Sequence, residues 1–123
     1  FESTDGFPIY VGRNNRQNDE LTFKLARKDD VWCHASKVHG SHVIISCGGQ
    51  KPPDDTVTQA AQLAAYYAET GGGQNIPVDV TTVKQVKKTP GGKPGMVIYH
   101  TYRTAIVNPY PDVRVDPLNA ESK

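Results

Sequence analysis

Residues 29–46 have the sequence DDVWCHASKVHGSHVIIS, in which two apolar runs are separated by a short polar connection. Side chains alternate across a strand, so an extended Val31–Ala35 would direct Trp32 and His34 to the same face. The second run, His42–Cys47, is rich in β-branched residues, which favours a buried strand. The stretch therefore predicts a β-hairpin with an aromatic ring, imidazoles and a hydroxyl near one end.

The rest of the 123-residue chain alternates apolar segments with turn signals, which predicts one domain. The fold we expect is α+β, a mostly antiparallel sheet packed on one face by a main helix over about 56–70. A short helix is expected over about 19–26, with Leu21 and Leu25 stacked on one side. The remaining expected segments are a strand at Phe7–Gly12, a strand at Val78–Val86 with a bulge or turn near Thr82–Lys84, a loop at Lys87–Gly95, and strands at Met96–His100 and Arg103–Val107.

The domain is expected to cover residues 1–110, and residues 111–123 are expected to form a flexible tail after Pro109 and Pro111. No apolar run approaches the ~20 residues that a membrane helix needs, and no signal-peptide pattern is present. We therefore expect a cytoplasmic protein without membrane contact, with Cys33 and Cys47 as free thiols, although the two could face each other across the hairpin. The chain begins at Phe1 and contains a single methionine, which is expected of a fragment of a longer protein.

The charge of the chain is small overall but unevenly distributed. Formal net charge is only +1, yet no acidic residue occurs between Val80 and Tyr110. That acid-free stretch contains four lysines that we predict to bind phosphates, namely Lys84, Lys87, Lys88 and Lys93. Such an asymmetry permits one basic face on a nearly neutral domain.

Three kinds of catalytic or cofactor chemistry have candidate residues but lack the required spacing. Cys33 and His34 are adjacent on a strand and diverge, so they do not share a metal ion, and no paired CxxC or HxxxH motif is present. Ser41 and His42 diverge in the same way and lack a G-x-S-x-G elbow. Lys93 stands in a glycine-rich loop without the Ser or Thr of a nucleotide-binding P-loop. The prediction is a protein without catalysis, metal or cofactor.

Binding of nucleic acid has better support from the residues. The polar segment 13–19 is dense in amides that can bond base edges or riboses, and the end of the hairpin combines rings with hydrogen-bonding groups. The alternative for Trp32 is a place in the hydrophobic core, and the alternative for the lysines is a solvated face. Besides the four lysines, the predicted RNA-binding residues are Arg13, Asn14, Asn15, Asn18, Trp32, His34, Ser41 and His42.

Several strings, in order, resemble the RNA-binding (R) domain of NFACT proteins: DGFPIYVGRNNRQNDELTFKLARKDDVWCHA, GSHVII, AAQLAAYYAE, VDVTTVKQVKK and GGKPGMVIY. The resemblance covers roughly Asp5 to Asn108. Two departures are Cys33, where the family commonly has a larger apolar residue, and Val38-His39, where Ile-Pro is usual before Gly-Ser-His.

The resemblance implies an RNA-binding domain of a bacterial ribosome quality-control factor. Such factors bind stalled large ribosomal subunits and tRNA and support alanine tailing of the nascent chain. The implied partners are tRNA and/or ribosomal RNA, the large subunit, and the remaining domains of the full-length protein. Members of this branch are often described as fibronectin-binding or fibrinogen-binding proteins, so an adhesin-like protein-interaction domain is the alternative.

Overall fold

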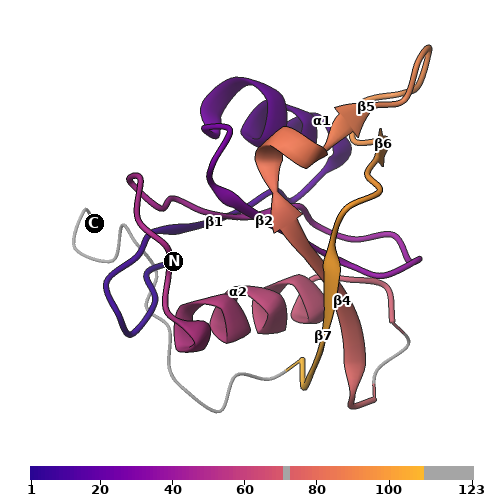
Figure 1. Ribbon diagram of the computed structural model, residues 1–123. Coiled ribbons are helices and arrows are strands. Elements are labelled where there is room, and N and C mark those ends of the chain that lie inside the picture. The colour runs from indigo at the N-terminus through magenta and orange to yellow at the C-terminus, as the bar shows by residue number, and fades with distance from the viewer. Residues whose placement is uncertain (71–72, 110–123) are drawn as a thin grey trace, which may run out of the picture.

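A five-stranded antiparallel sheet forms the centre of the molecule. The computed structural model describes residues 1–70 and 73–109, and the strand order is β1-β3-β2-β4-β7. The strands are β1 (Ile9–Val11), β2 (Val31–Ala35), β3 (Val43–Ile45), β4 (Ile76–Thr82) and β7 (Arg103–Val107). All four neighbouring pairs are antiparallel. With helices on both sides of this sheet (Figure 1), the fold is α+β, as the sequence predicts.

The predicted hairpin is confirmed as β2 and β3. Trp32 lies opposite Ile44 and Cys33 lies opposite Val43. Cys47 follows the end of β3, so it does not face Cys33 across the hairpin, and both cysteines are buried free thiols. The register therefore separates the two sulfur atoms that the sequence alone allowed to pair.

Helix α2 (Asp54–Tyr66) covers one face of the sheet, as Figure 1 shows. Its alanines Ala60, Ala61 and Ala64 have no exposed surface and pack among residues of β1 to β4 and β7. The helix begins two residues before the predicted start and ends four before the predicted end. Pro53 is the N-cap, not Asp54 or Asp55, because proline fits the extended backbone there and the two carboxylates occupy the first turn instead.

The opposite face of the sheet is covered by α1 (Asn15–Glu20) and the π-helical turn η1 (Leu21–Leu25). The predicted short helix therefore starts earlier, and most of the expected polar loop 13–19 is helical. The reason is the cap: the Asn14 side chain accepts a hydrogen bond from the Gln17 N–H at 2.8 Å. Asparagine at this position closes the first turn before Asn18 or Asp19 can do so.

The segment after β4 forms a small second sheet. The 3₁₀ turn η2 (Val83–Gln85) confirms the predicted break near residues 82–84. Strands β5 (Lys87–Lys88) and β6 (Val97–Ile98) then pair with each other. The expected loop 87–95 is thus partly strand, and the expected strand 96–100 shrinks to two residues outside the main sheet.

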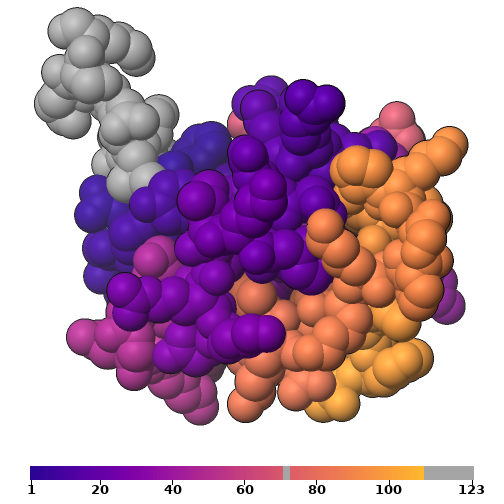
Figure 2. Space-filling model, turned by 90° about the horizontal axis from the view of Figure 1, so that it is seen from above, coloured from indigo at the N-terminus to yellow at the C-terminus, as the bar shows by residue number. Residues whose placement is uncertain are grey.

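Two hydrophobic clusters result, one on each side of the sheet. The cluster beneath α2 includes Cys33 and Val43, whereas Trp32 and Ile44 belong to the cluster beneath η1 and the β5–β6 hairpin. Alternation along β2 is what assigns neighbouring residues to different clusters. Figure 2 views the molecule from the second side, where residues of α1 and η1 (purple) border those of the β5–β6 hairpin (orange).

No helix among residues 1–70 and 73–109 is long and apolar enough to cross a bilayer. The expected tail 111–123 lies outside the described residues.

Candidate nucleic-acid interface

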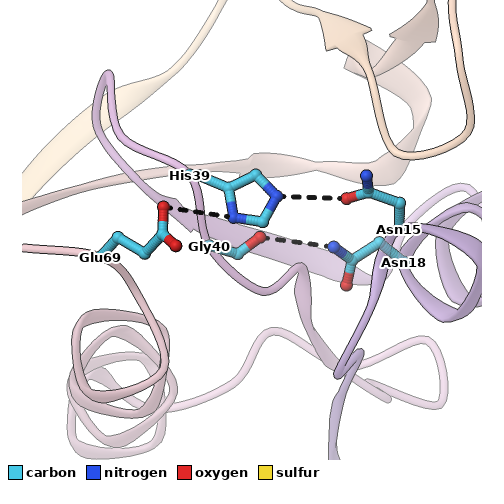
Figure 3. A network of polar contacts seen from close by, with 5 residues as sticks. All are labelled: Asn15, Asn18, His39, Gly40 and Glu69. Carbon is cyan, nitrogen blue, oxygen red and sulfur yellow. Dashed lines mark hydrogen bonds and ion pairs between the residues drawn. The ribbon is translucent and has the colours of Figure 1, made fainter.

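Asn18 joins α1 to the connection between β2 and β3. The residue is 3% exposed, and its Oδ1 accepts from the His42 N–H at 3.0 Å. Its Nδ2 donates to the Gly40 carbonyl at 3.3 Å (Figure 3). A Cβ on Gly12 would lie 2.0 Å from Asn18 Oδ1, so this amide requires glycine beside it. Both ends of the amide are occupied by protein, so Asn18 links α1 to this connection, and the structure places this predicted RNA-binding residue in the interior.

Asn15 lies on the exposed side of the same connection. Its Oδ1 accepts from His39 Nε2 at 3.3 Å, and His39 Nδ1 lies 3.7 Å from Glu69 Oε2 (Figure 3). These side chains come from α1, the β2–β3 connection and the segment after α2. His39 was not among the predicted site residues. The one feature of the sequence that could have indicated a site at His39 is its position directly before the Gly-Ser-His turn.

Arg13 is exposed, and its guanidinium carbon lies 4.5 Å from the centroid of the Tyr67 ring. This cation–π contact holds the arginine against the end of α2 while leaving it at the surface. Asn14 is also exposed, but its side-chain Oδ1 already accepts the Gln17 N–H that caps the helix. Of the predicted amide-rich segment, Arg13 and Asn15 therefore remain the side chains best placed for contact with a ligand.

Trp32 lies at the centre of a group of rings beneath the surface. Its ring centroid is 5.6 Å from that of His34 with nearly parallel planes, 5.2 Å from that of His42, and 4.8 Å from that of Tyr99. Trp32 is 0% exposed. The structure places the ring in the core, the alternative that the sequence also allowed, because β2 directs it under η1 and the β5–β6 hairpin.

The two histidines of this group are held neutral. Burial, followed by repulsion from His34, lowers the pKa of His42 to about 3. His42 Nδ1 shares a 2.8 Å hydrogen bond with the Thr22 hydroxyl, and burial also lowers the pKa of His34. His42 and Ser41 are both buried, whereas His34 keeps part of its surface exposed.

Asp79 supports the ring group from β4, and the sequence analysis missed it. This buried carboxylate accepts hydrogen bonds from the Tyr99 hydroxyl at 2.6 Å and the Thr104 hydroxyl at 3.1 Å. Burial first, and then the hydrogen bond to Asp79, raise the pKa of Tyr99, which keeps its hydroxyl protonated. An acidic residue inside an otherwise apolar strand was the available signal, since such a residue needs buried donors.

A hollow of about 300 Å³ opens beside these rings, and we call it the ring hollow. Its lining comes from β2, the β2–β3 connection and the segment 95–99. It includes His34, Lys37, Val38, His42, Met96 and Tyr99. The structure thus brings two of the predicted residues, His34 and His42, into one concave site with Tyr99 and Met96, which sequence reasoning did not assign.

Three of the four predicted lysines, Lys84, Lys87 and Lys88, lie along the border between η1 and the small second sheet. The Lys84 N–H donates to the Lys28 carbonyl at 3.0 Å, and Lys88 Nζ lies 5.3 Å from the centroid of the Phe23 ring. We call the exposed cations of this border the basic seam. Its members are Lys24, Arg27, Lys28, Lys84, Lys87 and Lys88.

Half of the basic seam was not predicted. Lys24, Arg27 and Lys28 precede Asp29 and Asp30. In the sequence alone, the two acidic residues offset the positive charge of these three. Asp30 is in fact buried, accepting from the Arg27 and Cys47 backbone N–H groups. Within the seam, Lys88 is partly neutralised because its Nζ lies 3.0 Å from an Asp19 carboxylate oxygen.

Lys93 lies apart from the seam, in the turn between β5 and β6. The Met96 N–H donates to the Lys93 carbonyl at 3.1 Å, which closes this turn beside the ring hollow. Lys93 is exposed. Its turn adjoins the hollow through Gly95 and Met96, which line it.

The described residues hold no group of three or more His, Cys, Asp or Glu side chains that could bind a metal ion. A larger hollow, about 530 Å³, lies on the α2 side of the sheet between residues such as Val57, Val80 and Arg103. None of the predicted site residues lines it.

A small α+β domain with exposed cations along one border offers the kind of side chains with which nucleic-acid-binding modules contact phosphates. The chain belongs to the family of NFACT protein RNA binding domains, whose family model matches residues 1–101. It is 43% identical over 112 residues to the Rqc2 homolog RqcH of Bacillus subtilis (strain 168), covering 91% of this chain and 19% of that protein. Identity to the Rqc2 homolog RqcH of Streptococcus pneumoniae (serotype 2, strain D39) is 50% over 101 residues, covering 82% of this chain and 18% of that protein.

The chain therefore spans about a fifth of the length of these curated relatives. A solved structure with the same fold is that of the C-terminal part of the fibronectin/fibrinogen-binding protein from Streptococcus suis. It has a TM-score of 0.85 and 45% identity, and the match covers 90% of this chain and 45% of that one.

Proposed function

We propose that this domain binds RNA without catalysis, as part of a ribosome quality-control factor that acts on stalled large ribosomal subunits. The RNA would be tRNA, ribosomal RNA or both, and the full-length protein would support alanine tailing of the nascent chain in the cytoplasm. The observation that carries the proposal is the basic seam in a member of an RNA-binding family. The relatives named RqcH support the assignment to this kind of factor.

The seam can act although the net charge is only +1. Attraction between exposed charges is screened over roughly 8–10 Å in physiological salt, so cations act on nearby phosphates rather than through the total charge. Lysine heads are flexible point charges that suit phosphates whatever the base sequence. The seam therefore supplies affinity, and any preference for particular nucleotides has to come from another part of the surface.

The experiment is a binding titration at several salt concentrations. Lys84→Ala/Lys87→Ala should weaken binding of a single-stranded or tRNA probe and reduce the slope of log affinity against log salt by about 1.4–1.8 in total. Lys51→Ala is the matched control, because Lys51 is also exposed but lies in the loop before α2. If the double variant binds like the wild type at low salt, the seam is a solvated edge and the proposal fails.

A second experiment identifies the RNA. Crosslinking in cells that carry the full-length protein, followed by sequencing, should recover tRNA and large-subunit rRNA. The same full-length protein with the Lys84 and Lys87 substitutions should recover less of both. The adhesin-like alternative instead predicts binding to fibronectin that is independent of these lysines, and recovery of background RNA alone would favour it.

A further inference from the structure

The ring hollow has the dimensions and the lining of a site for one planar ring. A volume of about 300 Å³ is larger than a nucleobase needs, and the hollow is open to solvent on one side. Three of its lining side chains carry rings, namely His34, His42 and Tyr99. Rings of this kind bind the faces of bases in single-stranded RNA through stacking, which every base can satisfy.

The rings are held firmly enough to act as a platform. His34 is stacked on Trp32 with an interplanar angle of 7°, and Tyr99 is fixed by its 2.6 Å hydrogen bond to Asp79. Trp32 itself contacts all three rings and lies behind them. A base entering the hollow would therefore meet preorganised rings, and little side-chain entropy would be lost on binding.

One polar atom in this group of rings lacks a hydrogen-bond partner. The indole Nε1 of Trp32 is the single buried side-chain nitrogen or oxygen without a hydrogen-bond partner among the described residues. A buried donor left unsatisfied costs free energy, about 1–3 kcal/mol. Trp32 does not line the hollow, but its ring contacts the rings of His34, His42 and Tyr99 that do, so its indole N–H reports on changes at those rings.

One cation lines the hollow, and a second lies in the adjoining turn. Lys37 lines it, is exposed, and has a left-handed backbone with φ of 61°. Lys93 belongs to the turn that is closed by the Met96 N–H, and Met96 is 51% exposed at the same rim. A cation that lines a ring-lined hollow, with a second in the adjoining turn, suits the phosphates on either side of an inserted base.

We propose that the ring hollow binds one unpaired nucleobase of the RNA, with the neighbouring phosphates at Lys37 and Lys93. This rests on the proposed RNA-binding function and adds a base-binding subsite to it. The basic seam supplies affinity for the backbone, and the hollow requires a base that is free to leave its helix. The domain therefore prefers RNA with unpaired nucleotides to a continuous duplex.

The chain contains one tryptophan, which gives the test a specific signal. In an amide NMR spectrum of the domain, the single indole N–H resonance should shift when ribonucleoside 5′-monophosphates are added at millimolar concentration. Ribose 5-phosphate, which has the sugar and phosphate but no base, should leave that resonance in place. A shift with both compounds, or with neither, contradicts base binding in the hollow.

A filling variant extends the test to oligonucleotides. The wild type should bind a short single-stranded RNA about five- to a hundredfold more tightly than the same strand with abasic sites. Val38→Phe, which fills the hollow, should abolish this difference while keeping the salt dependence of binding. Ile98→Phe is the matched control because Ile98 is exposed on β6 and does not line the hollow.

The outcomes separate the two proposals. If RNA binding depends on Lys84 and Lys87 but abasic and intact strands bind equally, the hollow is not a base site and the RNA-binding function stands. If neither strand binds to the folded wild-type domain, the proposed function fails as well. Thermal unfolding of both phenylalanine variants identifies any loss caused by misfolding. Should Val38→Phe not fold, the abasic comparison and the indole resonance of the wild type decide the question.

Discussion

Replacing Asn18 by alanine should destabilise the fold without removing a contact to RNA. The substitution leaves the His42 N–H and the Gly40 carbonyl without the amide that now binds both. The His42 group is fully buried, whereas Gly40 is only half-buried and can recover a bond to water. A buried unsatisfied group such as the His42 N–H costs about 1–3 kcal/mol, and the Gly40 carbonyl costs less. The free energy of unfolding should therefore fall by about 2–4 kcal/mol.

Denaturant unfolding followed by circular dichroism measures this change, and Asn15→Ala serves as the comparison. Asn15 is exposed and makes one 3.3 Å hydrogen bond, so its loss should change stability by no more than about 0.5 kcal/mol. Under conditions where both variants are folded, Asn18→Ala should bind RNA within about twofold of the wild type, which is within 0.5 kcal/mol. An Asn18→Ala domain with wild-type stability and weakened RNA binding would refute the structural role and restore the base-reading one.

Gly12, which lies against Asn18, provides a second test of the structural role of Asn18. A Cβ at position 12 would lie 2.0 Å from Asn18 Oδ1 and 3.0 Å from Asn18 Cα. Gly12→Ala should therefore be strongly destabilising alone. In the Asn18→Ala background the cost should be smaller, because the oxygen is gone while the backbone contact stays. Strict additivity in the double-mutant cycle would contradict this packing.

Two further predictions concern the two clusters of the core. Ala64→Asp places an unpaired charge beneath α2, so the domain should not fold, and a wild-type melting temperature would show that this helix face is wrongly assigned. The folded state holds the pKa of His42 at about 3, below the ordinary 6.5 of the unfolded chain, so the unfolded state binds more protons between these values. Stability should therefore fall as pH drops below 6.5, by about 2 kcal/mol at pH 5, and His42→Gln should flatten this dependence; a pH-independent wild type would contradict it.

Sequence patterns alone predicted much of the sheet. The alternation of Val31–Ala35 and the β-branched run after it predicted β2 and β3, and the alanine stripe predicted the buried face of α2. These predictions were correct because each depends on a local period, two residues for a strand and 3.6 for a helix, that does not need knowledge of the partner. Helix ends were less accurate, since Asn14 capped α1 ahead of Asn18 and Asp19, and the extended Pro53 preceded α2 where Asp54 or Asp55 was the expected cap.

The accessibility of the predicted site residues could not be obtained in this way. Trp32 and His34 share a face of β2, yet one is fully buried and the other is partly exposed. Which of them reaches solvent depends on where α1 and the β5–β6 hairpin lie on that face. Asn18 likewise carries the same side chain as Asn15, and only the position of the β2–β3 connection makes one a buried link and the other a surface group.

The sequence by itself determined the family, the α+β class, the hairpin at residues 31–45 and the acid-free stretch that contains Lys84 and Lys87. These features depend on the order of residue types along the chain. Only the tertiary structure decided that Lys24, Arg27 and Lys28 join those lysines, and that His34 and Tyr99 line one hollow. Both groupings bring together residues far apart in the chain. Their proximity is set by the packing of η1 and the second sheet against one face of the main sheet, which no local pattern encodes.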